Sequence, residues 1–161
     1  MRKLWNRNPL AMWSLSTINK HGETNMNICG YVTNISMEPR MMLVSMYHHT
    51  LTADNVKETK RGLLQLLTTE HVDIVHTLGK QSGRQIDKIE KTNKKHPVKY
   101  FKGLPFMTDT AGYMELKFVD FLEVGGDHVL GIAKVTSSKN FSDKPILTTD
   151  YLKEKGILRT N

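Results

Sequence analysis

Two threonines, Thr50 and Thr52, precede a stretch that is typical of a helix start, where short hydroxyl side chains can bind an anion. Thr52 can accept a hydrogen bond from an N–H group of the first turn, and Asp54 complements the positive helix end. Free N–H groups and the helix dipole favour an anion there. No GxxxxGK(S/T) or GxGxxG loop occurs. The alternative is that Thr52 is simply an N-cap.

A second polar group opens an extended stretch nearer the N-terminus, at Thr24, Asn25 and Asn27. Together with the hydroxyl-bearing loop, it gives a sheet with an apolar face and a rim of short hydrogen-bonding groups. Such a rim can hold a flat, polar ligand. The basic residues that could complete an anion site, if folding or a second subunit brings them close, are Lys80, Arg84 and Lys88.

The seven histidines and the single cysteine offer little further chemistry. His48 and His49 are adjacent, so on a strand they point to opposite faces. His71 and His76 have poor spacing for one helix face and do not form an HExxH motif. We therefore predict surface or loop histidines and no metal site. Cys29 excludes an internal disulfide, and its apolar neighbourhood predicts a structural, buried thiol.

Composition predicts one globular domain over residues 1–161, with 39% hydrophobic and 24% charged residues. No apolar run reaches membrane-spanning length, and the N-terminus lacks the apolar core of a secretion signal, so we expect a cytoplasmic protein. The net charge of +7 is concentrated in 88–102 and 134–155. A solvated basic face is the favoured interpretation. Steering of a phosphorylated cofactor is second, and nucleic-acid binding is disfavoured because aromatics and arginines are not interleaved.

Alternating and apolar runs predict seven strands, at 9–18, 25–32, 41–47, 63–67, 98–101, 112–124 and 128–135. The turns between them are expected at 19–22, 34–39 and 125–127, where glycine, asparagine or proline occurs.

Helices are predicted at 52–62, with Gly62 at the C′ position, at 70–78, weakly at 86–90, and at 151–156. Residues 137–149 are expected to form an irregular loop. This order of elements indicates a mainly β protein, an antiparallel barrel or sandwich with helical insertions.

The combined pattern resembles the flavin reductase-like family, whose members have an FMN-binding split β-barrel. The similarity covers roughly residues 9–136, and it rests on the order and spacing of several short motifs. These motifs are Pro9-Leu10-Ala11-Met12 with Ser16-Thr17, Gly22 with Thr24-Asn25, the Val32 to Pro39 turn, Thr52-x-x-Asn55-Val56, Ser82-Gly83-Arg84-x-x-Asp87-Lys88, and Gly126-Asp127-His128.

The resemblance implies an antiparallel Greek-key split barrel that forms a homodimer and binds FMN near the subunit interface. It implies that His128 lies on the nicotinamide side. The family pattern differs at Thr50-Leu51 and at Asn27 to Cys29, which leaves open whether flavin is retained or passes through as a substrate. The implied cofactor-binding residues are Asn25, Met26, Asn27, Ile28 and Cys29 along the ring, Tyr47, Thr50, Leu51 and Thr52 near the phosphate, and Arg84 and Lys88.

The expected function is an FMN-dependent oxidoreductase that takes hydride from NADH or NADPH and reduces flavin or a downstream acceptor, which can be a protein partner. Hydride transfer to a flavin needs positioning of the donor and tuning of the ring, and it needs no protein nucleophile. The alternative is a non-enzymatic module that binds flavin or haem, or an electron carrier.

Overall fold

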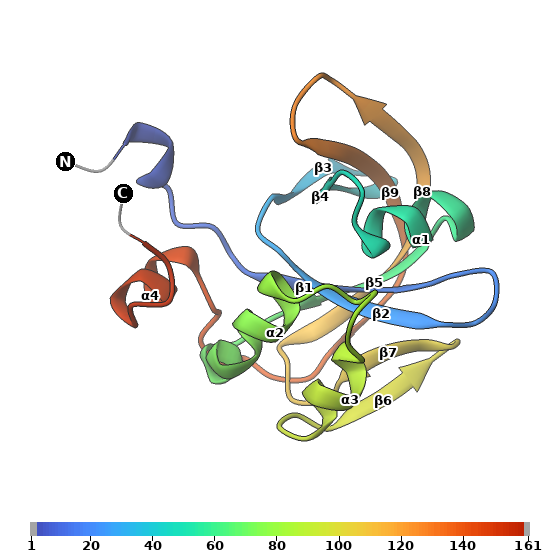
Figure 1. Cartoon of the computed structure of the whole chain (residues 1–161). Coiled ribbons are helices and arrows are strands. Elements are labelled where there is room, and N and C mark those ends of the chain that lie inside the picture. The colour runs from blue at the N-terminus through green and yellow to red at the C-terminus, as the bar shows by residue number, and fades with distance from the viewer. Residues whose placement is uncertain (1–2, 160–161) are drawn as a thin grey trace.

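Seven strands form one antiparallel sheet, in the order β2-β1-β5-β8-β9-β4-β3 (Figure 1). The computed structural model describes residues 3–159. Neighbouring strands pair antiparallel throughout the sheet. The strands are β1 (Trp13–Ile18), β2 (Thr24–Cys29), β3 (Val32–Met37), β4 (Arg40–Tyr47), β5 (Arg61–Leu66), β8 (Gly112–Glu123) and β9 (His128–Asn140).

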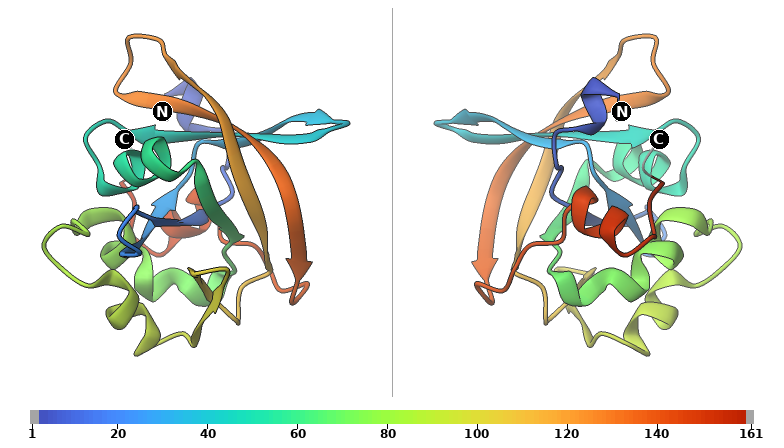
Figure 2. Two further views of the ribbon diagram at one scale, coloured as in Figure 1. Left: turned by 90° about the vertical axis from the view of Figure 1, so that its right-hand side faces the viewer. Right: turned by 90° about the vertical axis from the view of Figure 1, so that its left-hand side faces the viewer.

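The sheet curls around an apolar core, so that strands far apart in the sheet order approach each other. The Ser45 N–H donates to the Tyr31 carbonyl at 2.9 Å, which brings β4 to the end of β2. β8 and β9 are long and bent, and their register shifts near Phe118. The β3–β4 hairpin projects from the body of the molecule (Figure 2). The predicted mainly β, antiparallel split-barrel fold is confirmed.

A second layer of short helices and a small hairpin covers one end of the sheet (Figure 2). Its core contains Met26, Leu67, Leu78, Met107 and Leu147. The remaining elements are the 3₁₀ helices η1 (Leu4–Asn6) and η2 (Thr69–Ile74), the helices α1 (Leu51–Thr59), α2 (Val75–Lys80), α3 (Lys88–Asn93) and α4 (Thr149–Glu154), and the paired strands β6 (Val98–Phe101) and β7 (Leu104–Met107).

The ends of the described chain lie on the same side of the molecule (Figure 1). Lys153 Nζ donates to the Asn6 carbonyl at 2.9 Å, and the Leu10 N–H donates to Thr149 Oγ1 at 3.0 Å. These bonds tie α4 to the segment that precedes β1. Among residues 3–159, no helix is long and apolar enough to span a membrane.

The first helix begins and ends earlier than the sequence predicts. Thr50, which has extended backbone angles, is the N-cap, and its Oγ1 accepts from the Ala53 N–H at 3.2 Å. The prediction that Thr52 is the cap is therefore wrong. α1 ends at Thr59 with Lys60 in the left-handed conformation. Gly62 lies within β5 opposite Leu116 and does not follow the helix.

Three strand predictions also need correction. The segment 34–39 was expected to be a loop, but β3 continues to Met37 because β4 supplies its hydrogen bonds. β9 continues to Asn140, since the polar stretch after Val135 pairs with the start of β8. β7 was missed, and it pairs with β6 although it contains Pro105. In each case the strand forms because a neighbouring strand supplies its hydrogen bonds, and the local sequence does not show which strand that is.

Gly131 on β9 provides a test of the packing inside the barrel. A Cβ atom at this position would lie 2.6 and 2.8 Å from two Phe118 ring atoms and 3.0 Å from Met46 Cε. We expect Gly131→Ala to lower the free energy of unfolding by about 1–3 kcal/mol, because an overfilled core forces side chains out of their rotamers. Chemical denaturation followed by circular dichroism measures the change.

The matched control is Gly126→Ala in the β8–β9 turn, where a Cβ atom would have no neighbour within 4 Å. Its stability should change by less than about 0.5 kcal/mol. Equal stability of the two variants would contradict this account of the core.

Candidate functional site

The loop between β4 and α1 is held by Thr50 and Thr52. Thr50 Oγ1 donates to the Tyr47 carbonyl at 2.9 Å and caps α1. Thr52 is buried, and its Oγ1 accepts from Asn25 Nδ2 at 3.0 Å. The hydroxyls therefore fix the start of α1 against β2. Neither threonine is among the residues that border the two hollows described next.

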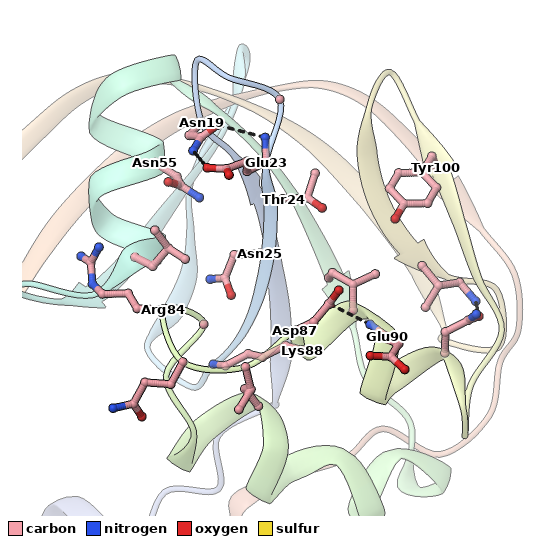
Figure 3. Close-up of a pocket in the computed structure, with 18 residues that line it drawn as sticks. Asn19, Glu23, Thr24, Asn25, Asn55, Arg84, Asp87, Lys88, Glu90 and Tyr100 are labelled. Atoms are coloured by element: carbon pink, nitrogen blue, oxygen red, sulfur yellow. Dashed lines mark hydrogen bonds between the residues drawn. The ribbon is translucent and has the colours of Figure 1, made fainter.

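A polar hollow of about 840 Å³ lies beside β2, between the start of α1 and the segment that leads into α3. We call it the polar hollow. Figure 3 shows Asn25 and Asn55 on one wall, with Arg84 and Lys88 beside them and Tyr100 of β6 across the opening. Most of its lining side chains are polar, which suits a hydrogen-bonding part of a ligand. Two of them are cationic, Arg84 and Lys88, and the carboxylates of Glu23, Asp87 and Glu90 also border the hollow, so an anion fits only at the Arg84 edge.

Lys88, the first residue of α3, has the most unusual environment of these side chains. It is 3% exposed, and its Nζ donates to Asn27 Oδ1 at 2.8 Å and to the Leu78 carbonyl at 2.9 Å. Burial disfavours the ammonium form and lowers the Lys88 pKa to about 8. The nearby Cys29 thiol is also buried, and burial raises its pKa to about 12. The prediction that the Cys29 thiol is buried is confirmed.

Arg84 approaches the start of α1 from the opposite chain segment. Its Nη2 pairs with the Asp54 carboxylate and lies 3.5 Å from the His49 carbonyl. Its neighbour Gly83 allows this approach, since a Cβ atom there would lie 2.1 Å from Asn25 Oδ1. The guanidinium and the positive end of α1 therefore share one edge of the polar hollow.

A second hollow, of about 580 Å³, lies along the end of β2. We call it the aromatic hollow. The His128 ring centroid lies 4.0 Å from that of Tyr47 and 5.3 Å from that of Tyr31. His128 Nδ1 lies 2.6 Å from the Asp127 carboxylate, which fixes the orientation of the imidazole. Asn27, Ile28 and Cys29 also border this hollow.

The two hollows share no lining residue, but they lie on either side of β2. Lys88 borders the polar hollow, Asn27 borders the aromatic hollow, and a hydrogen bond connects their side chains. The wall between the hollows is therefore held by this bond.

Most of the residues named from the sequence come together here. The polar hollow contains Asn25, Leu51, Arg84 and Lys88, and the aromatic hollow contains Asn27, Ile28, Cys29, Tyr47 and His128. Met26 is different, because its side chain is fully buried in the core of the helical layer.

Sequence reasoning missed three residues that shape the site. Asn55 borders the polar hollow, and its Nδ2 donates to Thr17 Oγ1 at 3.1 Å. Gly83 permits the close approach of its loop, and Tyr31 provides part of the aromatic hollow. Asn55 and Gly83 lie inside the Thr52-x-x-Asn55 and Ser82-Gly83-Arg84 motifs, and these motifs were the sequence feature that could have identified them as site residues.

Two histidines lie in unexpected places. His71 was predicted at the surface or in a loop, but it is fully buried in η2. Its ring stacks on that of His96, with centroids 4.5 Å apart. His96 follows α3 and is also buried. The spacing of His71 and His76 along one helix could not reveal this pair, because the fold brings His96 to His71 from a later segment of the chain.

Comparisons with known proteins agree with the fold and identify the family. The model of a family described as "Flavin reductase like domain" matches residues 5–151. Among curated proteins, no match was found. A protein from Sinorhizobium meliloti has a TM-score of 0.78 at 19% identity. That alignment covers 89% of this chain and 48% of the other, so this chain spans about half of that protein's length.

Two further solved structures cover most of both chains. An FMN-binding protein from Thermus thermophilus has a TM-score of 0.74 at 20% identity, with 87% of this chain and 75% of that chain covered. The styrene monooxygenase flavin reductase from Pseudomonas putida S12 has a TM-score of 0.73 at 19% identity, with 89% and 88% covered. At these identities the likeness shows a shared fold.

The pKa of Lys88 can be tested through stability. Between about 8 and the ordinary value of 10.5, the folded chain carries neutral Lys88 while the unfolded chain keeps it protonated. The unfolded state then binds more protons, so stability rises with pH in this window. We expect the free energy of unfolding of the wild type, minus that of Lys88→Met, to increase by up to about 1.4 kcal/mol per pH unit.

Denaturant titrations on either side of pH 8 measure this difference, with both proteins carrying Cys29→Ala because the charges of Cys29 and Lys88 affect each other's pKa. Lys117→Met, at an exposed position on β8, is the control. A wild-type minus Lys88→Met difference that is flat or falls with pH would contradict the buried-ammonium assignment.

Proposed function

Because the chain belongs to the flavin reductase-like family, we propose that it is an oxidoreductase that binds FMN and transfers hydride from NADH or NADPH to it. The observation that best supports the proposal is the pair of hollows on either side of β2, whose wall residues Lys88 and Asn27 are hydrogen bonded to each other. The residues present fit FMN, since one hollow offers aromatic faces and the other offers cationic and amide groups.

The ring of the flavin belongs in the aromatic hollow. Tyr31 and Tyr47 are 59% and 58% exposed, so each presents open ring surface to a flat ligand, although His128 packs against both. The amide of Asn27 reaches the same hollow, and Lys88 holds its oxygen. Asn27 Nδ2 donates to the Ile28 carbonyl at 3.4 Å, and its second N–H is left to donate to a polar ring edge. The ring supplies the hydride acceptor when FMN is bound, and the protein orients it.

The phosphate belongs in the polar hollow, near Arg84 and the first turn of α1. The helix N-terminus favours an anion, and the guanidinium adds charge-assisted hydrogen bonds. Lys88 contributes a second positive charge below its pKa of about 8. Thr50 and Thr52 act indirectly in this assignment, because their hydroxyls hold the loop that presents α1.

The donor approaches from the side of His128. This imidazole lies on the open side of the aromatic hollow, where Asp127 holds its Nδ1. It can contact the nicotinamide nucleotide, and hydride transfer itself requires no proton from the imidazole. His128 is accordingly a positioning residue for the donor.

A second copy of the chain completes this site in our proposal. Large apolar side chains are exposed around the aromatic hollow and on the neighbouring hairpins, including Met37 at 92% and Val124 at 67%. A homodimer that covers these residues would shield the flavin ring from water. The electrons then pass to free flavin or to an acceptor protein, such as an oxygenase that consumes reduced flavin.

Spectroscopy of the purified protein tests the activity. We expect FMN to bind with quenching of its fluorescence, and NADH or NADPH to bleach the bound flavin in the absence of oxygen. If only dithionite, and neither NADH nor NADPH, bleached the bound flavin, the protein would be an electron carrier and not a reductase. Failure to bind FMN or FAD at micromolar concentration would overturn the proposal.

Arg84→Ala tests the assignment of the phosphate end. The variant loses a charge-assisted hydrogen bond and leaves the Asp54 carboxylate unpaired beside the phosphate. We expect FMN affinity to fall roughly tenfold or more. Riboflavin, which lacks the phosphate, should bind the variant and the wild type with similar affinity. Fluorescence titration measures both ligands.

Lys117→Ala is the matched control, since it removes an exposed cation that borders neither hollow. Its FMN affinity should equal that of the wild type. If Arg84→Ala weakened riboflavin as much as FMN, the phosphate would lie elsewhere.

A further inference from the structure

A buried cluster in the helical layer contains two imidazoles and a carboxylate that the flavin site does not use. His71 Nε2 lies 3.2 Å from Asp109 Oδ1, and His96 Nδ1 lies 2.6 Å from Asp109 Oδ2. These donor groups come from η2, from the segment after α3, and from the β7–β8 turn. One ligand atom from each residue lies within 4.8 Å of the other two.

The outward nitrogen of each imidazole has a partner of its own. His96 Nε2 lies 2.9 Å from Asp73 Oδ1, and His71 Nδ1 lies 3.0 Å from Thr68 Oγ1 and 3.3 Å from the Thr68 carbonyl. The Thr68 N–H also donates to His71 Nδ1 at 3.2 Å, so in the metal-free chain His71 Nε2 carries the proton and donates to Asp109. Metal binding at Nε2 requires this proton to move to Nδ1, where the Thr68 carbonyl and Oγ1 are the acceptors. Both rings are therefore oriented from behind, and their inner nitrogens converge on Asp109.

We propose that His71, His96 and Asp109 form a binding site for a divalent transition-metal ion of the zinc type, with Thr68 and Asp73 as the groups that orient the imidazoles. Zinc accepts imidazole nitrogen and carboxylate oxygen together, usually with four ligands. The three protein ligands leave a position for water, on the side where the Asp109 carboxylate is 27% exposed.

The spacing suits this class of ion. In a tetrahedral zinc site with bonds of about 2.0 Å, the ligand atoms lie roughly 3.3 Å apart. The contacts at Asp109 are 3.2 Å to Oδ1 and 2.6 Å to Oδ2, and the three donor atoms lie within 4.8 Å of one another, so an ion replaces these hydrogen bonds and the side chains re-space around it. Calcium and magnesium prefer sites made of oxygen ligands, and two buried imidazoles disfavour them.

Charge balance also supports a divalent cation. The carboxylates of Asp73 and Asp109 face the two imidazoles, so a divalent ion at the inner nitrogens would lie beside negative charge. Lys95 Nζ lies 3.6 Å from Asp73, on the outer side of the cluster. A metal ion would therefore join η2, the end of α3 and the β7–β8 turn without leaving buried charge unmatched.

Zinc titration of tag-free protein, after removal of metal with a chelator and dialysis, tests the site. Isothermal titration calorimetry should give one Zn²⁺ per chain, and thermal unfolding should shift upward when zinc is added. Zinc has no redox chemistry, so both measurements are independent of flavin reduction. Magnesium at the same concentration should give neither effect.

Variants assign the ligands. We expect Asp109→Asn and His71→Gln to weaken zinc binding by at least about 100-fold, and Asp73→Asn to weaken it by about 10–100-fold through loss of orientation. Asp109→Asn keeps the side-chain volume, so it remains informative if removal of the buried His71 ring prevents folding. His76→Gln on α2 is the control, because this histidine is exposed.

Three results would overturn the proposal. They are no zinc binding by the wild type at micromolar concentration, wild-type affinity in folded Asp109→Asn, and a loss in His76→Gln equal to that in the other variants. In the first case the cluster is a hydrogen-bonded network only. None of these results bears on flavin binding, which is measured separately.

Discussion

The buried ammonium of Lys88 holds together the elements from which the candidate site is built. It bonds to the side chain of Asn27 on β2 and to the carbonyl of Leu78 on α2, while its own backbone begins α3. A buried charge is costly unless hydrogen bonds satisfy it, so these contacts fix the spacing of the strand and both helices. The same desolvation lowers the pKa of Lys88, which makes the wall of the polar hollow sensitive to pH near 8.

Local patterns predicted the barrel strands because the side chains of a strand alternate between the apolar core and the outer face of the sheet. The clearest case is the β8–β9 hairpin, where alternation on both sides of Gly125-Gly126-Asp127 marked two strands and the turn. The start of α1 was predicted two residues late, since Thr50 and Thr52 have equal capping ability. The structure distinguishes them, because the side chain of Asn25 on β2 donates a hydrogen bond to the Thr52 hydroxyl. That contact is invisible in the local sequence.

Site residues were predicted where they belong to a recognisable motif, even when the segments that meet at the site are far apart in the sequence. Helix-end physics alone gave an anion site at α1, and Lys80, Arg84 and Lys88 were the basic residues offered to complete it if folding brought them close. The structure supplies the physical reason, since Gly83 lets the intervening loop lie against Asn25. The pair of His71 and His96 had no such motif. Their stacking depends on how η2 packs against the end of α3, which spacing within one helix does not report.

The two polar clusters act on one continuous helical segment. η2 runs directly into α2, so the segment carries His71 near its start and the Leu78 carbonyl near its end. Asp109 and His96 hold the first part, and Lys88 holds the second. Because η2 and α2 are each only six residues long, neither is stable without tertiary contacts. A change that loosens the His71 cluster therefore also loosens the acceptor that keeps Lys88, and with it Asn27, in place beside the aromatic hollow. The histidine cluster and the acceptor of Lys88 therefore lie on one continuous segment, although the cluster does not border either hollow.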